Sequence, residues 1–196
     1  MNYMITQRLN TELKQRKNWP PNHHMFGLFQ ILNLLEDKLD HLKFHSNETK
    51  MIEIGSYMGE STLMFAASGM FKEIHCIDPF KGTEKLNEEC GYGWEEVKSE
   101  YGMNTRYFDN ITLHEDFSYN VVDEFENYAY DFVYIDGSHS YKDTYRDIEL
   151  YLPKAIQFIG GHNYQKEFPG VIEAVDKVLG EPDEVFRDFS WIKQIL

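Results

Sequence analysis

The chain has few cysteines and no long hydrophobic segment. Two cysteines occur in 196 residues, Cys76 in an expected strand and Cys90 in an expected loop, and their spacing forms no metal-binding pattern. They are typical of reduced thiols in a cytosolic protein. No apolar run approaches the ~20 residues that span a bilayer, and the N-terminus lacks the apolar core of a signal peptide. We therefore expect a soluble cytoplasmic protein without a membrane partner.

Basic residues are also scarce. Lysine and arginine number 19 against 33 acidic residues, which gives a formal charge of −14. A field of this sign repels phosphate backbones, so we expect no nucleic-acid partner. Aromatic residues make up 15% of the chain, too many for a disordered acidic protein. A chain of this length suits one domain, and we divide it into an N-terminal helical region, 1–49, and a core, 50–196.

The N-terminal region has one clear helical pattern. Residues 26–44 place apolar side chains at nearly helical spacing, whereas residues 1–17 are polar and indicate a short helix or an arm. Two consecutive prolines, Pro20 and Pro21, interrupt the segment between them. Residues 19–25 are either a lid over a ligand or a plain surface connection.

A strand, a glycine turn and a helix follow in succession. Residues 51–54 are a short apolar run, Gly55 and Gly59 form the turn, and residues 60–70 have a helical pattern. Such a unit begins a doubly wound α/β sheet, which binds ligands where its strand order reverses. A dinucleotide fingerprint would place glycines two and five residues after Gly55, but those positions hold Tyr57 and Glu60.

The remaining pattern alternates strands and helices. We expect further strands at residues 73–77, 111–114, 130–136, 155–161, 184–189 and 191–196, and helices within 81–106 and at 120–127, 141–152 and 171–179. The predicted fold class is α/β, a Rossmann-like doubly wound seven-stranded sheet with a C-terminal antiparallel hairpin.

Asp78 is a candidate ligand-binding residue because it directly follows the second expected strand, 23 positions after Gly55. A carboxylate there can accept hydrogen bonds from both hydroxyls of a ribose. The alternative is an ordinary loop acid or helix cap.

Two sets of motifs resemble a known family. The motif Glu53-x-Gly55-x-x-x-Gly59-x-Ser61-Thr62 resembles the first motif of class I S-adenosylmethionine-dependent methyltransferases, although it also suits an ordinary tight turn. The segments 134–141, 160–164 and 168–171 are similar to the group that includes macrocin and mycinamicin sugar O-methyltransferases and is related to catechol O-methyltransferase. The resemblance runs from about residue 51 to the C-terminus.

This resemblance implies a cofactor site for S-adenosylmethionine and a small-molecule hydroxyl as the methyl acceptor. The implied cofactor-binding residues are Glu53, Gly55, Ser56, Gly59, Ser61, Asp78, Asp116, Phe117 and Ser118. Asp116 or Ser118 would bond the adenine amine while Phe117 packs on the ring. The alternative for Asp116 and Ser118 is that they start the next helix.

The resemblance also implies a catalytic and metal-binding group. Asp136, His162 and Asn163 stand where relatives bind a divalent cation such as Mg or Mn, and His139 stands where they have the general base. Together, Asp136, His139, His162 and Asn163 would surround the acceptor. The His-Asn pair departs from the usual family pairs, so Asp136 is the one carboxylate of the three residues, a weak set for a hard cation. The alternative for His162 and Asn163 is that they shape the pocket without a metal. The alternative for His139 is that it caps a helix.

Two other classes of protein remain open from the sequence. A non-catalytic protein that binds S-adenosylmethionine would keep Glu53, Gly55 and Asp78 without needing His139. A nicotinamide-dependent oxidoreductase would use the same sheet, but the glycine spacing argues against it.

Overall fold

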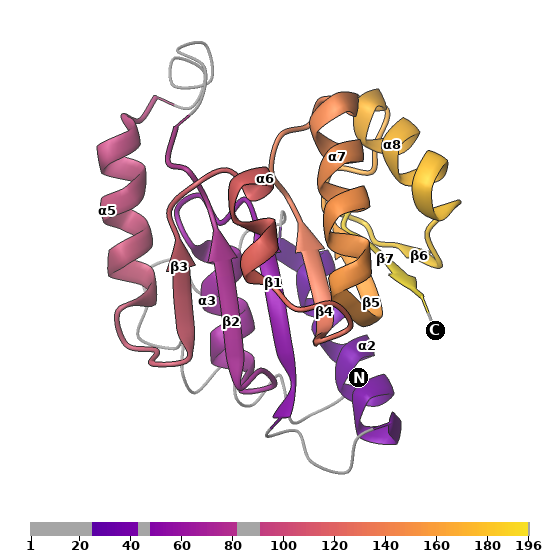
Figure 1. Cartoon of the computed structure of the whole chain (residues 1–196), viewed down its shortest axis with the longest axis horizontal. Helices are drawn as coiled ribbons and strands as arrows, with labels where there is room; N and C mark the ends of the chain where they lie inside the picture. Colours follow the sequence, from indigo (N-terminus) through magenta and orange to yellow (C-terminus); the bar gives the residue numbers. More distant parts are fainter. Residues whose placement is uncertain (1–24, 43–47, 82–90, 196) are drawn as a thin grey trace.

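The computed structural model describes residues 25–42, 48–81 and 91–195 (Figure 1). Its centre is a seven-stranded sheet with the order β3-β2-β1-β4-β5-β7-β6. Because β1 and β4 are neighbours, the strand order reverses between them, and the crevice at their carboxyl ends is the place where such sheets bind ligands.

The sheet has five parallel strands and two further strands, β7 and β6, that are joined to it by antiparallel pairing. The parallel strands pair in register, as Glu53 does with Tyr134, and β7 joins β5 in the antiparallel sense. The strands are β1 Lys50–Ile54, β2 Glu73–Ile77, β3 Ile111–His114, β4 Tyr130–Ile135, β5 Ala155–Gly161, β6 Glu184–Val185 and β7 Trp191–Gln194. The expected Rossmann-like fold with a terminal antiparallel hairpin is confirmed.

Helices cover both faces of the sheet (Figure 1). One face packs against α2 (Phe26–Leu42), α3 (Glu60–Ser68) and α5 (Trp94–Thr105). The other face packs against α6 (Ser118–Val121), α7 (Tyr141–Tyr151) and α8 (Pro169–Leu179), with 3-10 turns at η3 (Val122–Glu124) and η4 (Leu152–Lys154). Since both faces are covered, the central strands are mostly apolar, and every residue of β4 is buried.

The segment after β3 differs from the expected helix at residues 120–127. The helix α6 is only four residues long, starts at Ser118, and passes into η3. At Phe125 the backbone becomes extended, and the ring of this residue is buried against Tyr130 and Tyr151. Burial of one large aromatic side chain contributes about 1.5–3 kcal/mol, which outweighs the weak helix propensity of this short stretch.

The C-terminal strands are shorter than expected because residues 186–190 form a turn. Phe186 N donates to Ser190 O at 2.8 Å, and Ser190 N donates to Asp188 Oδ1 at 3.1 Å. The other carboxylate oxygen of Asp188 accepts from Gly27 N at 2.5 Å, at the start of α2. This turn therefore fixes the entry of the N-terminal helix.

Some expectations fall outside the described residues, namely the first helix or arm at 1–17 and nearly all of the 19–25 segment. Within the described ranges, none of the helices has the length and hydropathy that crossing a bilayer requires.

Candidate active site

The glycine turn after β1 packs directly against the turn after β4. Gly55 has φ 86°, and a Cβ built on it would lie 2.2 Å from Asp136 O and 2.7 Å from Gly137 Cα. Gly59 has φ 78° and precedes the first residue of α3. Only glycine satisfies both the positive φ and the close approach at position 55. The predicted cofactor turn and the loop with His139 are thus in contact.

Glu53 is fully buried beneath this turn. Its carboxylate accepts hydrogen bonds from the hydroxyls of Ser56 at 2.8 Å, Ser61 at 2.5 Å and Thr62, and from the thiol of Cys76 at 3.4 Å. Burial raises the pKa of Glu53, and the three hydroxyls oppose that shift. Glu53 therefore ties β1, the turn and the first turn of α3 together, and its contact with a cofactor stays a prediction, as do those of Ser56 and Ser61.

Asp78 lies at the carboxyl end of β2 and is 7% exposed. Its two oxygens accept from Tyr57 N at 2.8 Å and from Phe80 N at 2.7 Å. Both donors belong to residues with positive φ, so Asp78 stabilises two strained turns. Burial raises its pKa. Each carboxylate oxygen has a further lone pair, so the predicted acceptance of ribose hydroxyls is compatible with these bonds.

The predicted adenine-contacting residues follow β3. Asp116 Oδ1 accepts from Asn120 Nδ2 at 2.8 Å and from Phe117 N at 2.7 Å, and these bonds lower the pKa of Asp116. Phe117 is exposed and stacks on Tyr119, with ring centroids 5.3 Å apart. Ser118 is buried, and its hydroxyl donates to Asp147. The proton of Ser118 is thus already committed, while Asp116 and Phe117 remain accessible at the sheet edge.

Four predicted residues gather at the carboxyl ends of β4 and β5. Asp136 Oδ1 lies 3.7 Å from His139 Nε2 and 4.0 Å from His162 Nδ1. His162 Nδ1 lies 3.0 Å from Asn163 Oδ1. Since an amide oxygen can only accept, His162 Nδ1 is the donor in this contact, and Nε2 is the other nitrogen of the ring. That atom is buried without a hydrogen-bond partner among the described residues.

The residues of this cluster fit a divalent cation poorly. Asp136 is the sole carboxylate of the three predicted ligands, and the oxygen of Asn163 already accepts from His162. Within residues 25–42, 48–81 and 91–195, no three His, Cys, Asp or Glu side chains are grouped so that they could hold a metal. Hard cations prefer several charged oxygens.

His139 is held on several sides. Its side chain is 39% exposed, and its ring meets Phe168 edge-on at a centroid distance of 4.5 Å. Gly170, next to the start of α8, approaches so closely that a Cβ there would lie 3.0 Å from His139 O. The imidazole therefore lies between Asp136 and the ring of Phe168, and one side of it faces solvent.

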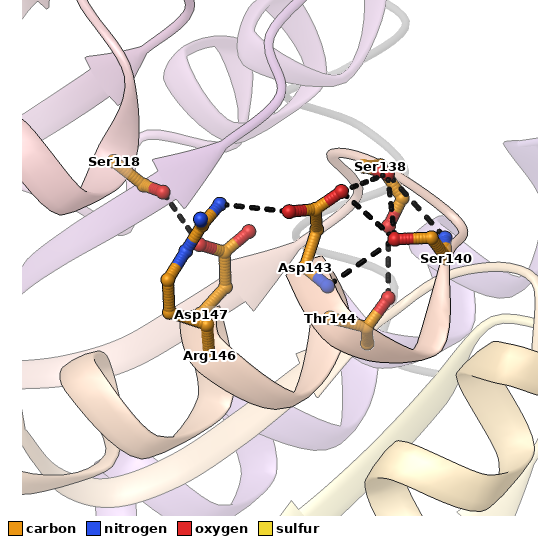
Figure 2. A network of polar contacts seen from close by, with 7 residues as sticks. All are labelled: Ser118, Ser138, Ser140, Asp143, Thr144, Arg146 and Asp147. Carbon is orange, nitrogen blue, oxygen red and sulfur yellow. Dashed lines mark hydrogen bonds and ion pairs between the residues drawn. The ribbon is translucent and has the colours of Figure 1, made fainter.

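The sequence patterns missed a polar network on α7 (Figure 2). Asp143 accepts from the hydroxyls of Ser138 and Ser140, and Asp147 accepts from Ser118. Burial raises the pKa of Asp147 to about 6. The Ser-x-x-Asp spacing from Ser140 to Asp143 is a capping signal that the sequence did contain. No sequence signal pairs Asp147 with Ser118.

The seven-stranded sheet, with its antiparallel strands at the C-terminus, has the α/β fold of methyltransferases. The chain belongs to the methyltransferase domain family, whose family model matches residues 52–157. The probable caffeoyl-CoA O-methyltransferase 3 of Dictyostelium discoideum is 28% identical over 110 residues, 54% of this chain and 40% of that protein. The match thus spans less than half of the relative's length.

Solved structures share the fold. The chain is similar to CalS11, a TDP-rhamnose 3'-O-methyltransferase of calicheamicin biosynthesis, with TM-score 0.60, 16% identity and coverage of 97% of this chain and 93% of that one. It is also similar to an O-methyltransferase from Bacillus cereus solved with S-adenosylhomocysteine, with TM-score 0.56, 15% identity and coverage of 98% and 90%. A third is TomG from Streptomyces achromogenes, solved with S-adenosylmethionine, with TM-score 0.56, 10% identity and coverage of 98% and 88%.

Proposed function

We propose that the protein is an S-adenosylmethionine-dependent O-methyltransferase that acts on a hydroxyl of a small molecule, such as a sugar. The observation that carries this proposal is the direct contact of the Gly55 turn with Asp136, three residues before His139. A methyl donor at the glycine turn and a base at the end of β4 would then share one crevice. The family membership and the O-methyltransferase relative support the same reaction.

His139 would act as the general base. An alcohol is a poor nucleophile until its proton is leaving, and a positioned base contributes ~10²–10⁴-fold. His139 accepts the acceptor's proton, and Asp136, at 3.7 Å, then faces a positive imidazolium that its carboxylate attracts. Bound S-adenosylmethionine would supply an electrophilic methyl group for the acceptor oxygen, with the electron pair of the carbon–sulfur bond left on sulfur.

The other residues of the crevice would bind and orient. Asp78 would accept the ribose hydroxyls with its remaining lone pairs, and Phe117 would offer its exposed ring to the adenine. His162 and Asn163, already bonded to each other, would line the acceptor side without a metal.

Calorimetric titration with S-adenosylmethionine, S-adenosylhomocysteine and NAD tests the cofactor. Binding of the first two and not of NAD is expected, and binding of NAD alone would contradict the proposal. The protein is then incubated with S-[methyl-²H₃]adenosylmethionine and one candidate acceptor per reaction. The candidates are TDP-rhamnose, caffeoyl-CoA, 3,4-dihydroxybenzoate and a panel of free sugars. A mass shift of one labelled methyl in an acceptor supports transfer. Binding without transfer to any of a broad set of hydroxyl compounds favours the non-catalytic alternative.

A further inference from the structure

His139 lies between two serines whose hydroxyls meet at one carboxylate. Ser138 Oγ donates to Asp143 Oδ2 at 3.0 Å, and Ser140 Oγ donates to the same oxygen at 2.8 Å (Figure 2). The residues directly before and after His139 are thus both tied to Asp143. We call Ser138, Ser140 and Asp143 the serine bracket.

Two further bonds fasten this loop to the first turn of α7. Thr144 Oγ1 donates to Ser138 O at 2.8 Å, and Asp143 N donates to Ser140 Oγ at 3.2 Å. The helix itself packs closely on α8 and contributes buried residues to the core. The loop with His139 therefore rests on a rigid element, as a precisely oriented base requires.

A helix cap alone does not explain these contacts. Capping requires only that Ser140 Oγ accept from Asp143 N. It requires neither the bond from Ser138 nor the ion pair between the other oxygen of Asp143 and Arg146 Nη2 at 3.0 Å. Burial acts to raise the pKa of Asp143, but the hydroxyls of Ser140 and Ser138 together with Arg146 hold that pKa below its usual value. Asp143 is therefore an ionised acceptor at neutral pH.

The contacts continue to the loop after β3. The guanidinium of Arg146 lies over the ring of Tyr119 at 4.1 Å, and Tyr119 stacks on Phe117. Arg146 thus joins Asp143 to the aromatic pair of Phe117 and Tyr119. The serine bracket therefore contacts the loop with His139 and, through Arg146, the residues that follow β3.

We propose that Asp143 is a positioning residue: through Ser138 and Ser140 it fixes the loop so that His139 stays between Asp136 and Phe168. This inference rests on the proposed role of His139 as the base. Among the described residues, the charged neighbour of the ring is Asp136 Oδ1 at 3.7 Å, beyond hydrogen-bond distance, and the side chain is 39% exposed, so its polar contacts alone do not fix its orientation. A displacement of about 1 Å of a reacting group lowers turnover up to ~10²-fold.

The test follows the imidazole of His139 directly, without an acceptor. Protein labelled with ¹⁵N-histidine is studied by long-range ¹H–¹⁵N correlation, and His139→Gln identifies the His139 signals among the eight histidines. Asp143→Ala and Ser138→Ala should shift or broaden these signals. Ser138→Ala leaves the capping residue Ser140 in place, so it decides the question if Asp143→Ala does not fold.

Matched variants separate positioning from general damage. Ser138→Thr keeps a hydroxyl and should restore the wild-type His139 signals. Asp123→Ala removes an exposed acid on η3 and should leave them unchanged. The signals of His75 and His114, which contact each other at 3.1 Å on β2 and β3, should be the same in all variants.

Unchanged His139 signals in Ser138→Ala would overturn the proposal. The proposal would also fail if Ser138→Thr changed the His139 signals as much as Ser138→Ala does. For whichever acceptor is methylated, kcat of Ser138→Ala should fall while the KM for S-adenosylmethionine stays the same. A wild-type protein that fails to bind S-adenosylhomocysteine would refute the proposed function, but the response of the His139 signals would still decide whether the bracket orients this ring.

Discussion

Gly55→Ala should destabilise the fold and also disorganise the crevice. A side chain at φ 86° costs about 1–2 kcal/mol in backbone strain. The new Cβ would also lie 2.2 Å from Asp136 O and 2.7 Å from Gly137 Cα, both main-chain atoms that no rotamer change can move away. Forcing a packed region apart adds about 1–3 kcal/mol. The expected loss of unfolding free energy is therefore about 2–5 kcal/mol.

The matched control is Gly180→Ala. Gly180 also has a positive φ, 73°, but a Cβ there meets no atom within 4 Å, so this variant reports the backbone strain without the clash. Urea unfolding measures the loss of unfolding free energy in both variants. Calorimetry measures their affinity for S-adenosylhomocysteine, which reports on the crevice. Gly55→Ala should lose more stability than Gly180→Ala and should bind more weakly. Equal stability losses with unchanged affinity would refute the close packing of the two turns.

Three further predictions concern single groups. Asp78→Ala should weaken S-adenosylhomocysteine binding by about 1.5–3 kcal/mol in calorimetry, and unchanged affinity would remove Asp78 from the site. Burial raises the pKa of Asp147 to about 6 from 3.8, so its ionised form destabilises the fold progressively as the pH rises between these values. Asp147→Asn should thus raise the unfolding free energy by up to about 3 kcal/mol near pH 8 but not below about pH 4. If the difference in unfolding free energy between variant and wild type were the same at both pH values, the burial of a charge would be contradicted. Because Asp136 is the one carboxylate among the three predicted ligands, EDTA should leave methyl transfer intact, and restoration of a lost activity by Mn²⁺ would show a metal site.

The central strands were predictable because they are short, mostly apolar runs between turn residues. Three of them, β2, β3 and β5, begin and end where the sequence indicated. The helix expected at 120–127 was wrong because its pattern is too short to reveal where Phe125 enters the core. Local propensity cannot specify that tertiary contact.

The site was predictable to the extent that it follows from topology. Parallel strands end at one edge of the sheet, so Asp136 and His162 had to be neighbours once β4 and β5 were paired. The bonds from Ser118 to Asp147 and from Ser138 to Asp143 depend on how α7 is rotated against its neighbouring loops. That rotation is set by side-chain packing, and spacing in the chain does not encode it.

The central claim is that His139 removes the acceptor's proton. The most direct measurement compares kcat of methyl transfer in the wild type and in His139→Ala, with the affinity for S-adenosylhomocysteine measured on the same preparations. The account predicts that kcat falls ~10²–10⁴-fold while the affinity is unchanged. A His139→Ala enzyme with near-normal kcat would contradict the account and leave the deprotonation to another group.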